Sequence, residues 1–196
     1  MQQRSGYHHG SLPSALVAAA LELLDEGGAE AVRVREVARR AGVSPGAPFR
    51  HFADRRALLT AVTGWVLEDF AQWQAGQAAE AAAAGEPVMR AFGLGFVRYA
   101  IRHPHRFSLL RSAVFAAEQP AELRPRLGEL DEVLAGLVVA AQRDGELPPG
   151  DPEVVTLGAQ ALVYGLAQMI VDGFLPVERA ESLAEQVLNT YAPDGH

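Results

Sequence analysis

Apolar side chains recur at intervals of three and four residues along most of the chain, which is the period of an α-helix with one buried face. Sustained alternation of apolar and polar positions, which is typical of a strand, is not seen. Glycine and proline interrupt the helical periods, for example at 27–28, 42–45 and 85–87. The pattern predicts an all-α protein of about nine helices.

The first two predicted helices are closely spaced. The first spans residues 12–26, with Ser11 as its N-cap and Gly27 at its end. The second spans residues 34–41 and ends at Gly42, which we expect in the left-handed conformation.

A third predicted helix is two turns long, with Ser44 as its N-cap and Pro45 at its first position. Pro48 removes one hydrogen bond near the start of this helix. We expect Val43, Phe49 and Phe52 to anchor it in the core, and a long fourth helix to begin at Arg55.

Positive charge is concentrated around these helices. The net charge is -7, yet residues 1–56 hold eight arginines against six acids, whereas residues 57–196 hold nine against eighteen. Two short helices joined by a turn and braced by a third form a helix-turn-helix, whose second helix enters the DNA major groove. Arginines here would neutralise phosphates. The candidates are Arg35, Arg39, Arg50, Arg55 and Arg56. The alternative is a solvated basic face that binds nothing.

The extreme N-terminus adds one further candidate. Arg4 would reach a phosphate or the minor groove as part of an arm, as in other helix-turn-helix proteins. The alternative is a tail that is disordered without DNA.

Several classes of chemistry are excluded. The absence of cysteine rules out disulfides, thiolate catalysis and cysteine-bound metals, and fits a reducing cytoplasm. The histidine pairs at 8–9 and at 103 and 105 lack a third ligand at useful spacing, so no metal site is predicted. Neither a catalytic motif nor a dinucleotide site is recognisable, so we expect no catalytic residue and no cofactor. The apolar stretch 156–171 is too short and too interrupted to span a bilayer, which predicts a protein without membrane segments.

Residues 16–62 read LVAAALELLDEGGAEAVRVREVARRAGVSPGAPFRHFADRRALLTAV. This segment resembles the DNA-binding domain of the TetR family of transcriptional regulators. The stretches YHHGSL and FVRYAIRHPHRF resemble a subgroup whose C-terminal domain is named after a Trp-His-Gly motif, of which this chain keeps only Gly165.

The resemblance implies roles for individual residues. The start of the recognition helix, where family members contact bases and nearby backbone, corresponds to Ser44, Pro45, Gly46 and Ala47. His51 and Arg55 match residues that contact phosphate. Phe49 stands where a phosphate-bonding tyrosine is common, and Arg33 stands where Ser or Thr usually caps the second helix, which exchanges a cap for a charge contact.

Aromatic residues are frequent in the second half of the chain, and cavities between bundle helices are lined by such residues. Ordinary core packing is the alternative for any one of them. The candidate pocket residues are Trp65, Phe70, Trp73, Phe92, Phe96, Tyr99, Phe107, Phe115 and the polar Gln168.

Two apolar stripes follow in the last helices. Both could be internal core, but small residues on the first would allow a second chain to approach closely. The resemblance implies that this helix pair forms a four-helix interface in a homodimer. The candidate interface residues are Gly158, Ala161, Leu162, Gly165, Leu183, Val187 and Leu188.

These observations predict a DNA-binding domain over residues 1–56 and a helical ligand-binding and dimerisation domain over residues 57–196. The function that fits is a TetR-type repressor, released from a palindromic double-stranded operator by an unknown small-molecule effector. The alternatives are a transcriptional activator, or a helical ligand- or partner-binding protein with weak or no DNA binding, which Phe49 and Arg33 favour.

Overall fold

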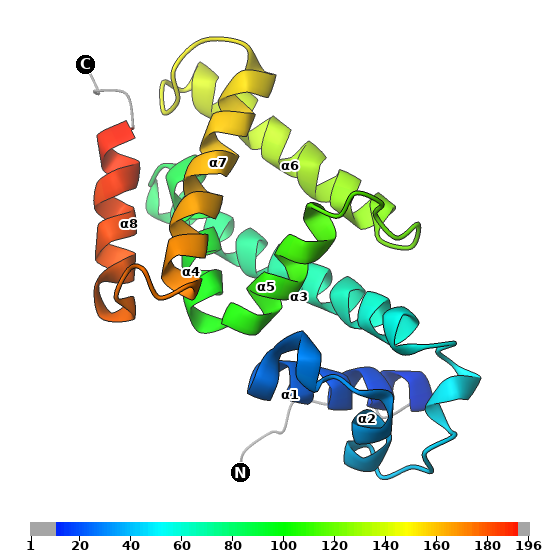
Figure 1. Cartoon of the computed structure of the whole chain (residues 1–196). Helices are drawn as coiled ribbons and strands as arrows, with labels where there is room; N and C mark the ends of the chain where they lie inside the picture. The colour runs from blue at the N-terminus through cyan, green and yellow to red at the C-terminus, as the bar shows by residue number, and fades with distance from the viewer. Residues whose placement is uncertain (1–10, 192–196) are drawn as a thin grey trace, which may run out of the picture.

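The computed structural model describes residues 11–191, and this part of the chain is entirely helical (Figure 1). It contains eight α-helices and one short 3-10 helix, close to the nine predicted. The elements are α1 (Leu12–Ala31), α2 (Val34–Arg40), η1 (Pro48–Arg50), α3 (Arg55–Ala84), α4 (Val88–Arg102), α5 (Pro104–Val114), α6 (Arg124–Arg143), α7 (Pro152–Val171) and α8 (Val177–Tyr191).

The first helix follows the predicted pattern. Ser11 caps α1 by accepting a hydrogen bond from the backbone N–H of Ser14, and Leu16, Ala20 and Leu24 are fully buried. Its regular part ends at Gly28, where φ is +70° and only glycine is free of strain. One further turn then carries the chain to Ala31.

The second helix also matches its prediction. Val37 and Ala38 are buried, and Gly42 follows the helix with φ of +69°. Arg33 stands at the N-cap position without a side-chain capping bond, as its side chain has no acceptor oxygen to offer.

The predicted third helix is wrong in extent. Residues 41–47 form turns, and only Pro48–Arg50 are helical, as the 3-10 helix η1. Pro48 has no N–H to donate to the carbonyl of Ser44, so Ala47 bonds there instead, with N and O 3.0 Å apart. Two prolines and a glycine within residues 45–48 leave too few helical hydrogen bonds for a two-turn α-helix.

Of the three predicted anchors of that helix, Val43 and Phe52 are confirmed and Phe49 is wrong. The side chain of Phe49 is 54% exposed, whereas Pro48 is buried and Phe52 is half-buried against the core. The 3-10 helix therefore turns the proline ring inward and the phenyl ring outward.

The long helix α3 connects the two ends of the molecule (Figure 1). It begins at Arg55 as predicted, with Asp54 accepting the backbone N–H of Ala57 at 2.8 Å. Its early residues Leu58 and Val62 pack with α1, and Phe70 packs with Phe96 of α4. A single hydrophobic core therefore runs from α1 into the larger group of helices.

The remaining helices surround α4. α4 packs against α3 on one side and against α7 and α8 on another, as Figure 1 shows. A second, smaller core lies between α4, α7 and α8, where Val97, Ala180 and Ala184 are fully buried. The prediction that the apolar stretch at 156–171 is too short to span a bilayer is wrong in length, because α7 begins four residues earlier. By length and composition alone, α7 is the one helix in the described part of the chain that could cross a membrane, with mean hydropathy 1.7, and 17% of that window is buried.

Arg106 of α5 forms a charged link between α1 and α3. Its Nε and Nη2 donate to the two carboxylate oxygens of Asp25 on α1 at 2.9 and 2.6 Å, and its Nη1 donates to Asp69 on α3 at 3.1 Å. The same Asp69 oxygen accepts the hydroxyl of Tyr99 at 2.8 Å, and the guanidinium lies 5.3 Å from the ring centroid of Trp65. Burial and the bond to Asp69 raise the pKa of Tyr99, which keeps its hydroxyl a donor.

Replacing Arg106 with alanine is expected to destabilise the protein, because Asp25 and Asp69 lose their shared cation. Removing one member of a buried ion pair costs about 3–5 kcal/mol, and we expect about 2–3 kcal/mol here because both carboxylates are partly in solvent. Urea unfolding followed by circular dichroism measures the change. The control is Arg179→Ala on exposed α8, and equal stabilities of the two variants would contradict the assignment.

Candidate nucleic-acid interface, ligand cavity and dimer face

The predicted recognition residues lie on an exposed turn. Ser44, Pro45 and Gly46 are exposed and Ala47 is half-buried, and Arg50 and His51 follow on the exposed side of η1. The turn is held from within by backbone bonds from Arg50 N to Ala47 O and from His51 N to Pro48 O. The turn presents the hydroxyl of Ser44, exposed backbone at Gly46 and the ring of Phe49 to solvent.

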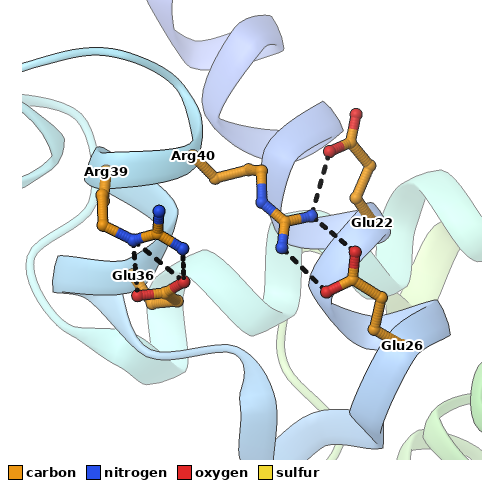
Figure 2. Close-up of polar contacts among 5 residues, drawn as sticks. All are labelled: Glu22, Glu26, Glu36, Arg39 and Arg40. Atoms are coloured by element: carbon orange, nitrogen blue, oxygen red, sulfur yellow. Dashed lines mark hydrogen bonds and ion pairs between the residues drawn. The ribbon is translucent and has the colours of Figure 1, made fainter.

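Part of the basic charge is already paired within this module (Figure 2). Arg40 leaves α2 and donates to Glu26 of α1 through both terminal nitrogens at 2.8 Å, and to Glu22 at 3.2 Å. Arg39 pairs with Glu36 one turn earlier on its own helix. The hydrogen bonds from Arg40 and Arg39 lower the pKa of Glu26 and Glu36, so these carboxylates stay ionised at neutral pH. The Arg40 pairs hold α2 against α1.

Four arginines of the module remain available. Arg33, Arg35, Arg50 and Arg56 are exposed and take part in no ion pair among residues 11–191. The cationic surface is therefore smaller than the arginine count of the sequence indicates, since sequence spacing does not reveal the pairs with Glu22 and Glu26.

Arg55 has an internal contact that the sequence did not predict. Its Nε donates to the carbonyl of Val32 at 2.8 Å and its Nη2 to the carbonyl of Ala29 at 2.5 Å. Both carbonyls lie where α1 ends, so Arg55 fastens the start of α3 to α1. The predicted arm residue Arg4 lies outside the described residues.

A small cavity of about 110 Å³ lies between α3, α4, α6 and α7. Of the predicted pocket residues, Phe70, Phe92 and Phe96 line it. Tyr164 of α7, which the sequence did not indicate as a pocket residue, lies against Phe96 with ring centroids 4.6 Å apart, and burial raises the pKa of Tyr164 to about 12. Asp131 of α6 adds a carboxylate to this wall.

The other six predicted pocket residues lie outside this cavity. Trp73 donates its indole N–H to the Gly95 carbonyl at 2.8 Å, and Tyr99 is held by Asp69, so both rings are fixed in the core by their polar atoms. Trp65 lies beneath Arg106, and Phe107 packs edge-on against Phe96.

Phe115 and Gln168 complete this set. Phe115 is 64% exposed at the end of α5, with its ring 5.2 Å from that of Tyr164. Gln168 donates to Asp172, the residue that follows the end of α7. Core packing, the alternative for each aromatic residue, therefore accounts for Trp65, Trp73, Tyr99 and Phe107.

Two larger clefts were not predicted. One, of about 740 Å³, lies between the start of α4, the α6–α7 connection, α7 and α8. The other, of about 1170 Å³, separates the start of α3 from the α5–α6 connection, and His51 and Arg56 lie on its wall. Neither has a recognisable sequence signal, because each is assembled from segments far apart in the chain.

The predicted dimer stripe on α7 is largely uncovered. Gly158, Ala161 and Gly165 are exposed, and Leu157, directly before Gly158, is 67% exposed. Leu162, Leu183, Val187 and Leu188 are half-buried at the α7–α8 junction. Leu166, Ala167 and Ile170 face inward, so α7 is apolar on two sides.

No cluster of three or more histidine or acidic side chains that could hold a metal ion occurs within residues 11–191. The candidate sites are therefore the exposed turn with its arginines, the apolar cavities and the α7 stripe.

A module in which α2 and the short helix η1 flank an exposed turn, joined by the long helix α3 to a larger helical body, has the arrangement of a helix-turn-helix transcription regulator. Residues 16–62 match the family model for bacterial regulatory proteins of the tetR family, and residues 89–191 match the model for the tetracyclin repressor-like C-terminal domain. The chain belongs to the TetR family. The Trp-His-Gly subgroup stays a prediction.

Solved structures agree with this fold. A protein of unknown function from Rhodococcus sp. RHA1 is 28% identical, with a TM-score of 0.77 over 96% of this chain and 100% of that chain. A TetR family transcription regulator from Marinobacter aquaeolei is 19% identical, with a TM-score of 0.64 over 89% and 93% of the two chains. The TetR family regulator PfmR from Thermus thermophilus is 20% identical, with a TM-score of 0.63 over 95% and 98%. A search of curated proteins gives no match.

Proposed function

We propose that this TetR family regulator is a homodimeric repressor that binds a palindromic operator and is released by a small-molecule effector. The observation that carries the proposal is the exposed turn from Ser44 to Ala47, flanked in sequence by the arginines Arg35, Arg50 and Arg56 without acidic partners. Such cations release counterions from phosphates, and the turn presents backbone and a hydroxyl to base edges.

The character of the turn favours a particular kind of DNA recognition. Because its side chains are small and Phe49 is exposed, apolar contact with thymine methyl groups and a response to DNA shape should outweigh hydrogen-bond readout. His51 is exposed and available for a phosphate. Arg55 would act mainly by fixing α3 to α1, with any phosphate contact secondary.

The proposed division into a DNA-binding domain at 1–56 and an effector and dimerisation domain at 57–196 cuts just after the start of α3. This helix is the proposed lever, because it begins beside the DNA-binding turn and carries Phe70 to the cavity wall. An effector that moves α3 or α7 would change the spacing of two recognition turns, which must fit successive major grooves about 34–36 Å apart.

The α7 stripe supports a four-helix dimer interface with α8. Its exposed small residues allow close approach, and burial of Leu157 and its neighbours by a second copy would account for the high hydropathy of α7 without a membrane. A cytoplasmic location is part of this proposal. We infer a binding protein and not an enzyme, with no cofactor.

One observation favours a second candidate. The recognition segment has only a 3-10 turn where the family usually has a helix, and Arg39 and Arg40 are already paired with acids. A helical ligand- or partner-binding protein with weak or no DNA binding would have these features. An activator would use the same DNA contacts as a repressor, and a reporter assay distinguishes the two.

Replacing Arg50 with alanine should weaken operator binding and reduce the salt dependence of the binding constant. Each lost phosphate contact lowers the slope of log K against log salt by about 0.9. Arg39→Ala is the matched control, since Glu36 already compensates this cation and its loss should change the slope less. Fluorescence anisotropy with a palindrome selected from genomic fragments provides the measurement.

Equal slopes for Arg50→Ala and the unmodified protein would refute the phosphate assignment. Failure of the unmodified protein to select any palindrome or to bind its own upstream DNA would favour the second candidate.

Replacing Ala161 with arginine should convert the dimer into a folded monomer, because two extra charges would be buried at the centre of the interface. Sedimentation velocity measures the mass, and circular dichroism checks folding. Val139→Arg on α6 is the control, since Val139 is apolar and 53% exposed but lies away from the stripe. A dimer that survives Ala161→Arg, or that only Val139→Arg disrupts, contradicts the proposed interface.

A further inference from the structure

The 740 Å³ cleft beside α7 has the dimensions of a ligand site, whereas the aromatic cavity does not. Small-molecule pockets usually measure about 300–1,000 Å³, and the cavity next to Phe96 holds about 110 Å³. The two spaces share Met89, Gly93, Ala159 and Val163 as walls, so a ligand in the cleft would lie directly behind the cavity.

The walls of the cleft are aliphatic. Met89 of α4, Leu147 of the α6–α7 connection, Val155 and Leu162 of α7, and Leu188 of α8 face it. No aromatic side chain is among the described residues that line it. Flexible aliphatic walls suit a flexible hydrocarbon chain better than a flat ring system.

One cation in the cleft wall lacks a partner. Arg90 of α4 lines the cleft, is half-buried, and takes part in no hydrogen bond or ion pair among residues 11–191. A guanidinium beside an apolar wall and without a protein carboxylate is best matched by an anionic group on a ligand.

The two acids in the wall already have partners. Asp144 accepts hydrogen bonds from Arg143 at 2.9 and 3.2 Å, and Glu146 accepts the backbone N–H of Met89 in the first turn of α4 at 3.4 Å. Arg90 is therefore the charged group of the wall that is available to pair with an anionic group of a ligand.

We propose that this cleft binds an aliphatic acid, with its hydrocarbon chain along α7 and its anionic head group at Arg90, and that this acid is the effector class. Binding of the acid in the cleft does not depend on the proposed repressor function, whereas the role of the acid as effector rests on it. Gly158 and Leu162 belong both to the cleft wall and to the predicted dimer stripe, so an occupant would bear directly on the dimer contact.

Calorimetric titration of the intact protein with decanoate, decyl sulfate and 1-decanol, each below its micelle concentration, tests the site. Decanoate and decyl sulfate should bind, and decanol should bind at least tenfold more weakly. Arg90→Gln should weaken decanoate binding roughly tenfold to a hundredfold, as expected for a charge-assisted hydrogen bond, and should leave decanol unchanged. Arg90→Lys should restore part of the affinity.

Two further variants distinguish the effect of the Arg90 charge from the effect of the space in the cleft. Arg111→Gln removes an exposed cation of α5 outside the cleft and should leave decanoate binding unchanged. Ala159→Phe narrows the cleft from α7 and should weaken all three compounds while the thermal unfolding curve stays cooperative.

The proposal is overturned if neither anion binds, if decanol binds as tightly as decanoate, or if Arg90→Gln and Arg111→Gln behave alike. Binding of decanoate only to the monomeric Ala161→Arg variant would mean that the second copy closes the cleft, which also overturns it.

Operator release is measured separately by anisotropy. If the protein binds its operator but decanoate occupies the cleft without releasing DNA, the site stands and its role as effector site is wrong. If no operator is bound at all, the repressor function fails, while the calorimetric result for Arg90 still decides the site.

Discussion

The link from Arg106 to Asp25 and Asp69 sets the orientation of the DNA-binding module relative to the rest of the molecule. The hydrophobic core extends from α1 through α3 to α4, but apolar contacts alone tolerate small rotations. A guanidinium held by two carboxylates from different helices has far less freedom, because its donors lie in a fixed plane. α5 thus fixes α1 to α3 at the level of Tyr99, whose ring touches Phe70 of the cavity wall at 5.1 Å between centroids. Any rearrangement around that cavity bears on the angle at which α1 presents the exposed turn.

The arginines of the DNA-binding module have two competing roles: some hold its helices together, and others are free to contact phosphates. Arg40 and Arg55 hold α1, α2 and α3 together through Glu26 and the carbonyls of Val32 and Ala29, so these cations strengthen the scaffold and are less free to meet phosphates. Arg35 and Arg50 have no such contacts in the described part of the chain. The paired residues lie at the surface, where single ion pairs contribute little to stability, and their main effect is to fix the helix orientation.

Much of this architecture follows from the sequence, because helical periods, the Ser11 cap and the glycines at 28 and 42 act locally. The start of α3 was predictable for the same reason. The exposure of the α7 stripe was not, because an apolar stripe at helical spacing fits an internal core equally well. The short recognition segment was only half predictable: Pro48 signalled a lost hydrogen bond, but the choice between a weakened α-helix and a 3-10 turn depends on whether Pro48 or Phe49 is buried. The cavity was less predictable still. Whether an aromatic ring lines a cavity or packs in the core depends on partners such as Asp69 and Gly95, which are distant in sequence. Arg90 carried no signal, since an unpaired Nε is visible only when its surroundings are known.

Helix α7 contributes to the core, to the aromatic cavity and to the exposed stripe, because three of its faces have different neighbours. Leu166, Ala167 and Ile170 pack inward, Tyr164 closes the aromatic cavity, and Leu157 and Ala161 face solvent on the stripe proposed to meet a second copy. The aliphatic cleft opens between the stripe and α8, with Leu162 on its wall. A helix is a rigid rod over 20 residues, so a shift imposed on one face is carried to the others. In the proposed dimer, occupation of the cleft, the packing around Tyr164 and the separation of the two protomers would therefore be coupled through one element. Since the protomers of the proposed dimer meet on α7, that separation also sets the distance between the two DNA-binding turns.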